Sequence, residues 1–143
     1  MQLARFLELI HRSAHRQWAR RAGDAGLTYS EFEYLSAIRD QEARQTSKGD
    51  HGQHLQDVVD DMGVRKASAS AMVVKLEARG WVHRVPCRYD ARAQHILLTE
   101  EGAVQLAKGR EIYTEAAREL LGRLEGEEQQ AVANLLEHLE PGT

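Results

Sequence analysis

The sequence predicts a mainly α-helical chain that contains one small antiparallel β-hairpin. Apolar residues recur at three- and four-residue spacing over most of the chain, and only two prolines interrupt it. Between residues 81 and 98 this spacing changes to alternation, which is typical of paired strands. A length of 143 residues, with 42% hydrophobic and 29% charged residues, fits one globular domain with additional helices for self-association.

The amino-terminal part contains two predicted helices. The first covers residues 2–22, and Gly23 and Gly26 are expected to end it. Thr28 and Glu31 have the spacing of a capping box, in which the hydroxyl accepts a backbone N–H and the carboxylate reaches back, so a second helix is expected to start there. Residues 41–53 are polar, rich in turn formers and without a period, which predicts a loop.

Two short helices with a glycine turn between them come next. The first ends at Gly63, and its apolar residues are Leu55, Val58, Val59 and Met62. The second ends at Gly80, and its expected inner face consists of Ala69, Met72, Val73 and Leu76. Two helices joined in this way form a helix-turn-helix.

A hairpin and two further helices complete the predicted order of elements. Residues 81–85 and 95–98 are the expected strands, and the polar, basic connection between them is expected to be exposed. Thr99 offers a hydroxyl cap to a helix that should end near residue 122. A last helix is expected over residues 127–139. A helix-turn-helix followed by a basic hairpin is a winged helix, so the fold class is a winged helix-turn-helix with additional amino- and carboxy-terminal helices.

The distribution of charge indicates a nucleic-acid partner. The whole chain has a net charge of −3, but residues 65–92 contain seven basic and two acidic residues, a local net charge of +5. The remainder of the chain therefore carries −8. A basic segment in an acidic body suits binding to phosphates, although a solvated charged face is the alternative interpretation.

The geometry of B-form DNA selects candidate contacts within this segment. The major groove admits one helix, so the outward residues of the second short helix are candidates to contact it: Arg65, Lys66, Ser68, Ser70 and Lys75. The hairpin is placed to bring an arginine to the narrow minor groove, and Arg84, Arg88 and Arg92 are the candidates. The alternatives are that the serines only keep the helix soluble and that Arg92 is an ordinary turn residue.

The sequence at this point resembles the MarR family of bacterial transcriptional regulators. The matching residues are Asp90-Ala91-Arg92, residues 95–102 (HILLTEEG) and residues 73–82 (VVKLEARGWV). The resemblance implies one domain over residues 1–143, with a winged-helix lobe at 28–99 and a helical dimerisation lobe at 1–23 and 100–140. It also implies a homodimer on a pseudopalindromic DNA site, with Arg92 in the minor groove and Asp90 orienting it by an ion pair.

The resemblance further implies regulation by a small molecule. Many members release DNA when a phenolic or other ligand binds between the two lobes, so this chain is expected to be a repressor with an aromatic or phenolic effector. The candidate ligand-binding residues are His15, Arg16, Trp18 and Tyr34. The family usually has a serine or threonine where this chain has Arg65, so Arg65 is expected to contact a phosphate instead.

Other classes of function have less support. The sequence contains no nucleophile–base pair, phosphate-cradling glycine loop or metal-hydrolase spacing, so an enzyme is not expected and no catalytic residue or cofactor is assigned. A winged helix that binds another protein would not need the concentration of basic charge. No apolar run is long enough to cross a membrane, and the amino terminus does not resemble a signal peptide.

Histidines and the single cysteine leave two alternatives open. His11 and His15 lie one helical turn apart, and His51 and His54 lie in the predicted loop. Zinc binding is therefore an alternative to ordinary surface positions, and no metal site is assigned. Cys87 cannot form an internal disulfide, which suits a reducing cytoplasm. Its position between Arg84 and Arg88 favours a redox switch, whereas a lone cysteine on a strand is usually inert.

Overall fold

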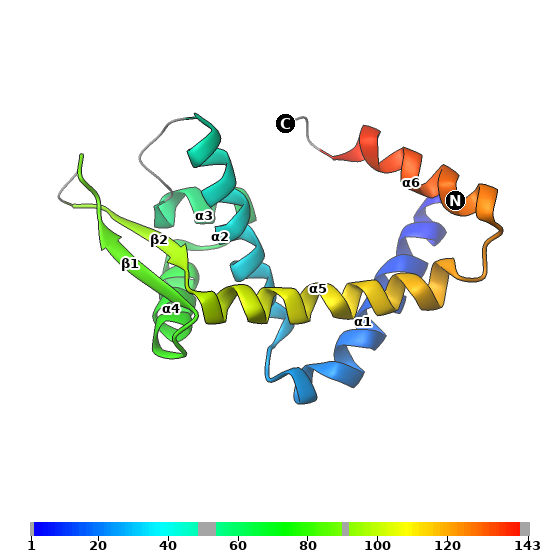
Figure 1. Cartoon of the computed structure of the whole chain (residues 1–143), viewed down its shortest axis with the longest axis horizontal. Coiled ribbons are helices and arrows are strands. Elements are labelled where there is room, and N and C mark those ends of the chain that lie inside the picture. The colour runs from blue at the N-terminus through cyan, green and yellow to red at the C-terminus, as the bar shows by residue number, and fades with distance from the viewer. Residues whose placement is uncertain (1, 49–53, 90–91, 141–143) are drawn as a thin grey trace. The chain divides into compact units, whose positions relative to one another are not determined.

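The structure is a computed structural model that describes residues 2–48, 54–89 and 92–140, and it describes only the backbone of residues 44–48. In chain order, the elements are α1 (Gln2–Ala25), α2 (Tyr29–Lys48), α3 (Leu55–Met62), α4 (Lys66–Ala78), β1 (Val82–Pro86), β2 (Gln94–Leu98), α5 (Glu100–Leu121) and α6 (Gly126–Leu139) (Figure 1). The predicted fold class is confirmed. In the described part of the chain, no helix combines the length and the apolar character needed to cross a bilayer.

The chain divides into two compact units. The helical unit consists of residues 1–20 and 111–143, and the winged unit consists of residues 21–110. The winged unit therefore contains α2, α3, α4, the β1–β2 hairpin and the first half of α5. The helical unit contains most of α1, the second half of α5 and α6.

The winged unit is built around side chains from α2, α3, α4 and β1. The largest fully buried side chains are Leu27, Leu35, Ile38, Leu76, Glu31, Val58, Val73 and Val82. Ala69, Val73 and Leu76 form the buried stripe of α4, as predicted, whereas Met72 is half-buried. Because this stripe fills the core, the opposite face of α4 points to solvent.

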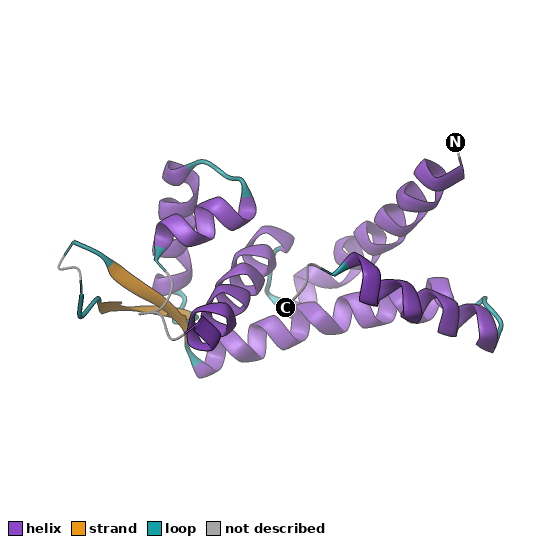
Figure 2. Ribbon diagram, turned by 90° about the horizontal axis from the view of Figure 1, so that it is seen from above, coloured by secondary structure: helices purple, strands orange, loops and turns teal. Residues whose placement is uncertain are grey.

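The turn and the hairpin also follow the sequence-based expectation. Gly63 adopts φ +66° and its N–H donates to the carbonyl of Val59 at 2.9 Å, which ends α3 in a left-handed turn that favours glycine. The strands pair antiparallel, with Val82 opposite Leu98 and Pro86 opposite Gln94. Figure 2 shows these strands side by side, running into the connection at the end of the hairpin.

Thr99 connects the start of α5 to the end of α4. Its backbone N–H donates to the carbonyl of Trp81 (3.0 Å), and its hydroxyl donates to the carbonyl of Gly80 (2.7 Å) and accepts the N–H of Gly102 (3.0 Å). A Cβ at Gly102 would lie 2.0 Å from the Trp81 carbonyl oxygen, so only glycine permits this close approach. The predicted cap at Thr99 is confirmed.

Two helix boundaries differ from the prediction. Helix α1 continues through Gly23 to Ala25 and ends at Gly26, because one internal glycine costs a helix only about 1 kcal/mol. Helix α2 continues through residues 41–48, where a loop was expected. Those residues include good helix formers, but all of them except Ala43 are polar, so the sequence shows no apolar period there. Residues 49–53 lie outside the described residues.

The start of α2 contains a buried carboxylate, that of Glu31, with 0% exposure. Its Oε1 accepts the backbone N–H of Thr28 (2.9 Å), and the Thr28 hydroxyl accepts the backbone N–H of Glu31 (3.1 Å), so the predicted capping box is confirmed. The other oxygen, Oε2, accepts Nη1 of Arg79 at 2.6 Å and lies 3.7 Å from Nζ of Lys75. The carboxylate thus joins the start of α2 to the end of α4.

Arg79 also contacts two other parts of the winged unit. Its Nη2 donates to the carbonyl of Gly26 at 2.7 Å, and its guanidinium lies 3.7 Å from the centre of the Trp81 ring. Burial raises the pKa of the Glu31 carboxyl, but the hydrogen bonds from Thr28 and Arg79 together outweigh this effect, so the pKa lies below its ordinary value of 4.5. Glu31 is therefore charged in the folded protein at neutral pH.

Replacing Glu31 with glutamine is expected to lower the free energy of unfolding by about 1–3 kcal/mol at pH 7, because the charge-assisted hydrogen bonds are lost. The folded-state pKa is below the unfolded-state value, so wild-type protein has this stabilisation above the unfolded-state pKa and loses it as the pH falls through the folded-state pKa. Urea unfolding at a series of pH values should show the gap between wild type and variant closing on acidification below 4.5.

The matched control is Glu33→Gln, which removes the same charge from the same helix at a half-buried position. Equal losses of stability in the two variants at pH 7, or a gap that does not change with pH, would contradict the role assigned to Glu31.

Candidate nucleic-acid interface

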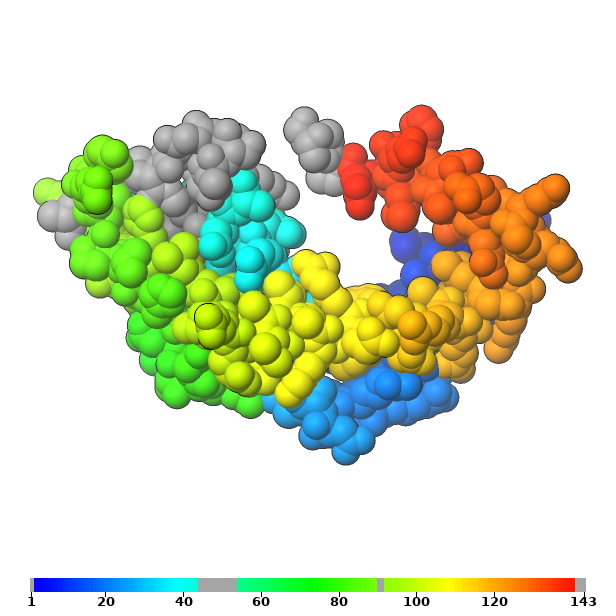
Figure 3. Space-filling view, in the orientation of Figure 1, coloured from blue at the N-terminus to red at the C-terminus, as the bar shows by residue number. Residues whose placement is uncertain are grey.

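The outer face of α4 carries most of the residues that the sequence predicted for the major groove. Arg65, Lys66 and Ser68 are exposed, and Lys75 has a half-exposed side chain. Ser70 is half-buried, so it faces outward only in part. Figure 3 shows α4 and the hairpin, both in green, as neighbouring parts of the surface of the winged unit.

The same face contains three exposed residues that the sequence analysis did not select. Ala67 and Ala71 are exposed, and Val74 is 54% exposed. Apolar side chains of this size can contact the methyl group of thymine in the major groove. The search for polar side chains missed them, but their helical spacing opposite Ala69, Val73 and Leu76 was a signal that could have found them.

Arg65 lies at the N-cap of α4. It has extended backbone (φ −75°, ψ 141°), and its side chain makes no capping hydrogen bond. The start of α4 therefore combines backbone N–H groups that no side chain caps with two exposed basic residues, Arg65 and Lys66. This arrangement of donors and positive charge suits a phosphate group.

The hairpin places its arginines in two different environments. Arg84 is half-buried in β1, and its Nε lies 3.6 Å from Oε2 of Glu77. Arg88 and Arg92 are exposed in the connection between the strands. Asp90, which was expected to orient Arg92, lies outside the described residues. Tyr89, which the sequence analysis did not select, is 73% exposed beside them.

The basic residues of this segment therefore fall into two groups. Lys75, Arg79 and Arg84 lie near carboxylates, and the short contact of Arg79 with buried Glu31 makes it part of the core support. Arg65, Lys66, Arg88 and Arg92 are exposed on α4 and the hairpin. The second group is the more exposed to solvent.

The four candidate ligand-binding residues lie in different environments. His15 and Arg16 are exposed in α1. Trp18 is buried, and its ring packs edge to face with the ring of Tyr113, with centroids 6.1 Å apart. Arg16 borders a small pocket of about 100 Å³ in the helical unit, together with Leu9, Ser13, Glu119, Leu120 and Arg123. Tyr34 is buried in α2 of the winged unit, where burial first and the charge of Glu33 second raise the pKa of its phenol.

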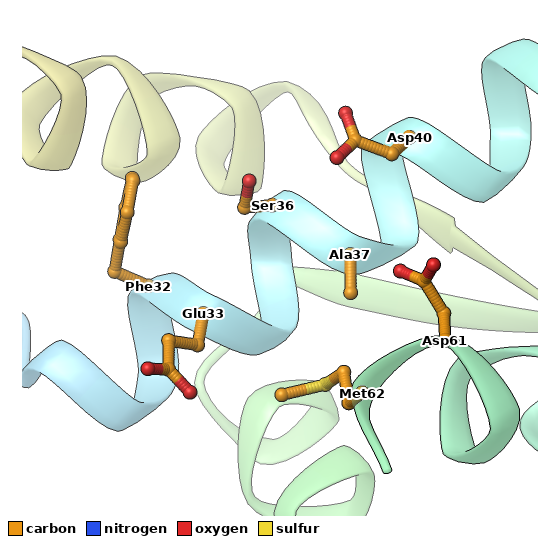
Figure 4. Close-up of a pocket in the computed structure, with 7 residues that line it drawn as sticks. All are labelled: Phe32, Glu33, Ser36, Ala37, Asp40, Asp61 and Met62. Carbon is orange, nitrogen blue, oxygen red and sulfur yellow. The ribbon is translucent and has the colours of Figure 1, made fainter. Parts of the chain in front are cut away.

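A larger groove of about 270 Å³ lies between α2 and α3. Its described lining residues are Phe32, Glu33, Ser36, Ala37, Asp40, Asp61 and Met62 (Figure 4). Three of them are acidic and none is basic. Figure 4 shows the Asp40 and Asp61 carboxylates projecting from α2 and α3 near the same end of the groove.

The positions of the histidines and the cysteine agree with the sequence analysis only in part. The His11 and His15 rings are stacked with centroids 6.5 Å apart, and both are exposed. Cys87 is buried, with 6% exposure, instead of lying open on the hairpin. It is close to His54 and His95, whereas His51 lies outside the described residues.

Comparisons with known proteins indicate a family. Residues 25–93 match the sequence model of the MarR family. The transcriptional regulator HosA of Escherichia coli O111:H- is 38% identical to this chain over 71 residues, which cover 50% of this chain and 53% of HosA. The match thus spans about half the length of this curated relative.

Solved structures share the fold over nearly the whole chain. A mutant of MarR from E. coli in complex with operator DNA has a TM-score of 0.68 and 20% identity, covering 99% of this chain and 95% of the MarR chain. BpsR from Bordetella bronchiseptica, whose DNA binding is regulated by 6-hydroxynicotinic acid, has a TM-score of 0.66 and 22% identity, covering 97% of this chain and 98% of BpsR.

Proposed function

We propose that this chain, whose residues 25–93 match the MarR-family model, is a transcriptional regulator that binds double-stranded DNA through α4 and the β1–β2 hairpin. The observation that carries the proposal is the exposure of Arg65, Lys66, Arg88 and Arg92 on these two elements of one compact unit. The complex of a MarR mutant with operator DNA, which shares this fold, supports it. The match to this family also agrees with the expectation that the chain is not an enzyme.

Helix α4 is proposed to lie in the major groove. Its buried stripe fixes the helix to the core and leaves Ser68 and Ala71 facing outward. Ser68 offers a hydroxyl to base edges, and Ala67, Ala71 and Val74 offer apolar contacts to thymine methyl groups. Arg65 and Lys66 then contact a phosphate at the start of the helix. This contact would take the place of the one made by the capping serine or threonine that is usual in the family.

The hairpin is proposed to contact the adjacent minor groove. Arg92 is the candidate to enter it, because an arginine is attracted to the negative potential of a narrow groove. Asp90 is the proposed ion-pair partner of Arg92, on the basis of the family pattern. Arg88 is exposed on the same connection, and we propose that it contacts the sugar-phosphate backbone of the DNA.

A homodimer is proposed from the apolar surface of the helical unit. Large apolar side chains of α1 and α6 are exposed there: Leu3 (76%), Phe6 (49%), Leu7 (67%), Leu135 (54%), Leu136 (53%) and Leu139 (76%). Burying one leucine completely is worth about 1.5–3 kcal/mol, so covering this surface favours association strongly. A second copy is the simplest cover, and a two-fold dimer matches a pseudopalindromic site.

We further propose that this regulator is a repressor that a small aromatic effector releases from DNA. The regulation of BpsR by 6-hydroxynicotinic acid supports an effector of this size. The groove between α2 and α3 offers Phe32 for stacking and three carboxylates, so it favours a cationic or neutral aromatic ligand over an aromatic acid. The pocket beside Arg16 is the site that an aromatic acid would select.

The DNA contacts are tested with Arg92→Ala and fluorescence anisotropy on duplex DNA from upstream of the chain's own gene. The variant is expected to bind about tenfold or more weakly, a loss of about 1–3 kcal/mol. For wild type, the logarithm of affinity should fall steeply with the logarithm of salt concentration, because bound phosphates release counterions.

The control for this experiment is Arg12→Ala, which removes an exposed arginine from α1 and should leave the affinity unchanged. If Arg92→Ala bound DNA as tightly as the wild type does, the assignment of the hairpin to the minor groove would be contradicted. An affinity that does not depend on salt would favour a protein-binding winged helix instead.

The dimer is tested with Leu136→Glu in α6 and sedimentation velocity. Placing a charge in the proposed interface on both copies is expected to raise the dimer dissociation constant by about a hundredfold or more. Gln130→Glu, which adds the same charge to an exposed polar position of α6, should sediment as wild type does. Wild-type protein that sediments as a monomer at micromolar concentration would refute the dimer.

The effector is tested by measuring release of labelled DNA by three compounds: an aromatic amidine, a phenol and an aromatic acid. The amidine is expected to release DNA at the lowest concentration, and Asp40→Asn should weaken its effect about fivefold, the value of about 1 kcal/mol for an exposed ion pair. Asp24→Asn, an exposed aspartate of α1, is the control.

Release by the acid that is weakened by Arg16→Ala and not by Asp40→Asn would place the effector at the Arg16 pocket. Failure of all three compounds to release DNA would contradict the proposal of an aromatic effector.

A further inference from the structure

Three potential metal ligands meet where the two strands of the hairpin run into their connection. His54 is the N-cap of α3, Cys87 directly follows β1, and His95 lies in β2. One ring nitrogen of each histidine and Sγ of Cys87 all lie within 4.8 Å of one another. The three residues belong to different elements, and only the fold of the winged unit brings them together.

The backbone around these residues is well fixed. His95 pairs with Val85 in the strand ladder, and the N–H of Cys87 donates to the carbonyl of Ala93 at 3.1 Å. Helix α3 packs against β2, and the rings of His54 and His95 meet edge to face with centroids 4.9 Å apart. The side chains of the group are therefore held close together by elements that the core already positions.

The burial of the group fits a metal site better than a set of surface side chains. Cys87 is 6% exposed, and both histidines are half-buried with fully buried Nε2 atoms. Nδ1 of His54 lies 4.0 Å from Oδ2 of Asp57. A metal-bound histidine commonly donates its other ring N–H to a carboxylate. Asp57, whose Oδ2 accepts the backbone N–H of His54 at 2.8 Å, is a nearby carboxylate that a small rotation of the ring would bring within reach.

The types of ligand define the class of ion. A thiolate and two imidazoles suit a borderline-soft transition metal, and zinc binds this combination in tetrahedral sites. With bonds of about 2.0–2.3 Å, tetrahedral ligand atoms lie about 3.3–3.8 Å apart. The present separations reach this range by small rotations of the side chains.

We propose that His54, Cys87 and His95 bind one zinc ion per chain, with the fourth position open to water. Binding requires the thiol proton to leave to solvent and changes no oxidation state, so no oxidant or reductant takes part. The ion joins both ends of the segment 88–94 to the start of α3. Since this segment carries Arg88 and Arg92, a consequence that rests on the proposed function is that zinc raises the affinity for DNA by ordering the hairpin.

The site is tested on the full chain, freed of metal with a chelator and kept reduced, by titration with Co²⁺ and displacement by Zn²⁺. Cys87 is the only cysteine, so a thiolate-to-cobalt charge-transfer band identifies it as a ligand. Native mass spectrometry is expected to show one ion per chain. Cys87→Ser should lack the band, and His95→Asn should bind the ion more than about tenfold more weakly.

His83→Asn is the matched control, because His83 is an exposed histidine of the same hairpin, outside the group. Circular dichroism of each variant without metal verifies that it is folded. Absence of the thiolate band in wild type, an equal loss of affinity in His83→Asn, or half an ion per chain, which indicates bridging between two chains, would each overturn the site.

DNA affinity measured with and without zinc separates this proposal from the proposed function. Zinc is expected to raise the affinity of wild type several-fold and to leave that of Cys87→Ser unchanged. Wild-type affinity that does not respond to bound zinc would overturn the coupling to the hairpin. A chain that binds zinc as expected but binds no DNA in either state would refute the proposed function and uphold the metal site.

Discussion

The buried carboxylate of Glu31 is the interaction on which the arrangement of the winged unit depends. A charge removed from water is tolerated only where donors are held in fixed positions around it. Arg79 supplies these donors from the end of α4, and the same guanidinium contacts the carbonyl of Gly26 and the ring of Trp81. Thr99 extends the connection from Trp81 to the start of α5. The contact between Arg79 and Glu31, at the carboxy-terminal end of α4, thus helps to set the direction in which the outer face of this helix points.

This arrangement changes the meaning of the basic segment. As a count, residues 65–92 have a net charge of +5, but the structure assigns Arg79 to the core and places Lys75 and Arg84 near carboxylates. The remaining basic side chains of the segment are exposed and lie at the start of α4 and at the end of the hairpin. The proposed interface is therefore two separate basic points with an apolar helix face between them, which suits a helix in the major groove with phosphate contacts on either side.

Two features of this chain go beyond what the family resemblance implied. Arg65 occupies the N-cap of α4, where its charge opposes the helix dipole and lowers the stability of an isolated helix. This cost is recovered where a phosphate binds beside it. The group of His54, Cys87 and His95 lies where the strands of the hairpin run into their connection, so the same few residues link the helix-turn-helix to the segment that is proposed to enter the minor groove.

The sequence by itself determined the elements and their order, because each depends on neighbours a few residues apart. The capping box of Thr28 and Glu31, the turn at Gly63 and the cap at Thr99 are local patterns, and all three formed as predicted. The end of α2 was missed because its residues are almost all polar and therefore show no apolar period. Asp90 and residues 49–53 stay outside this comparison.

Only the tertiary structure decided which side chains meet. The sequence showed Arg79 only as one of the basic residues of the segment 65–92, and the fold places it against Glu31, 48 residues away in sequence. The spacing of the histidines suggested His11 and His15, whereas packing of α3 on β2 brought His54 to His95 and Cys87. Contacts of this kind depend on burial and on distance in space, and neither produces a periodic pattern in the sequence. For this physical reason, local patterns predicted the fold but not the contacts between distant residues.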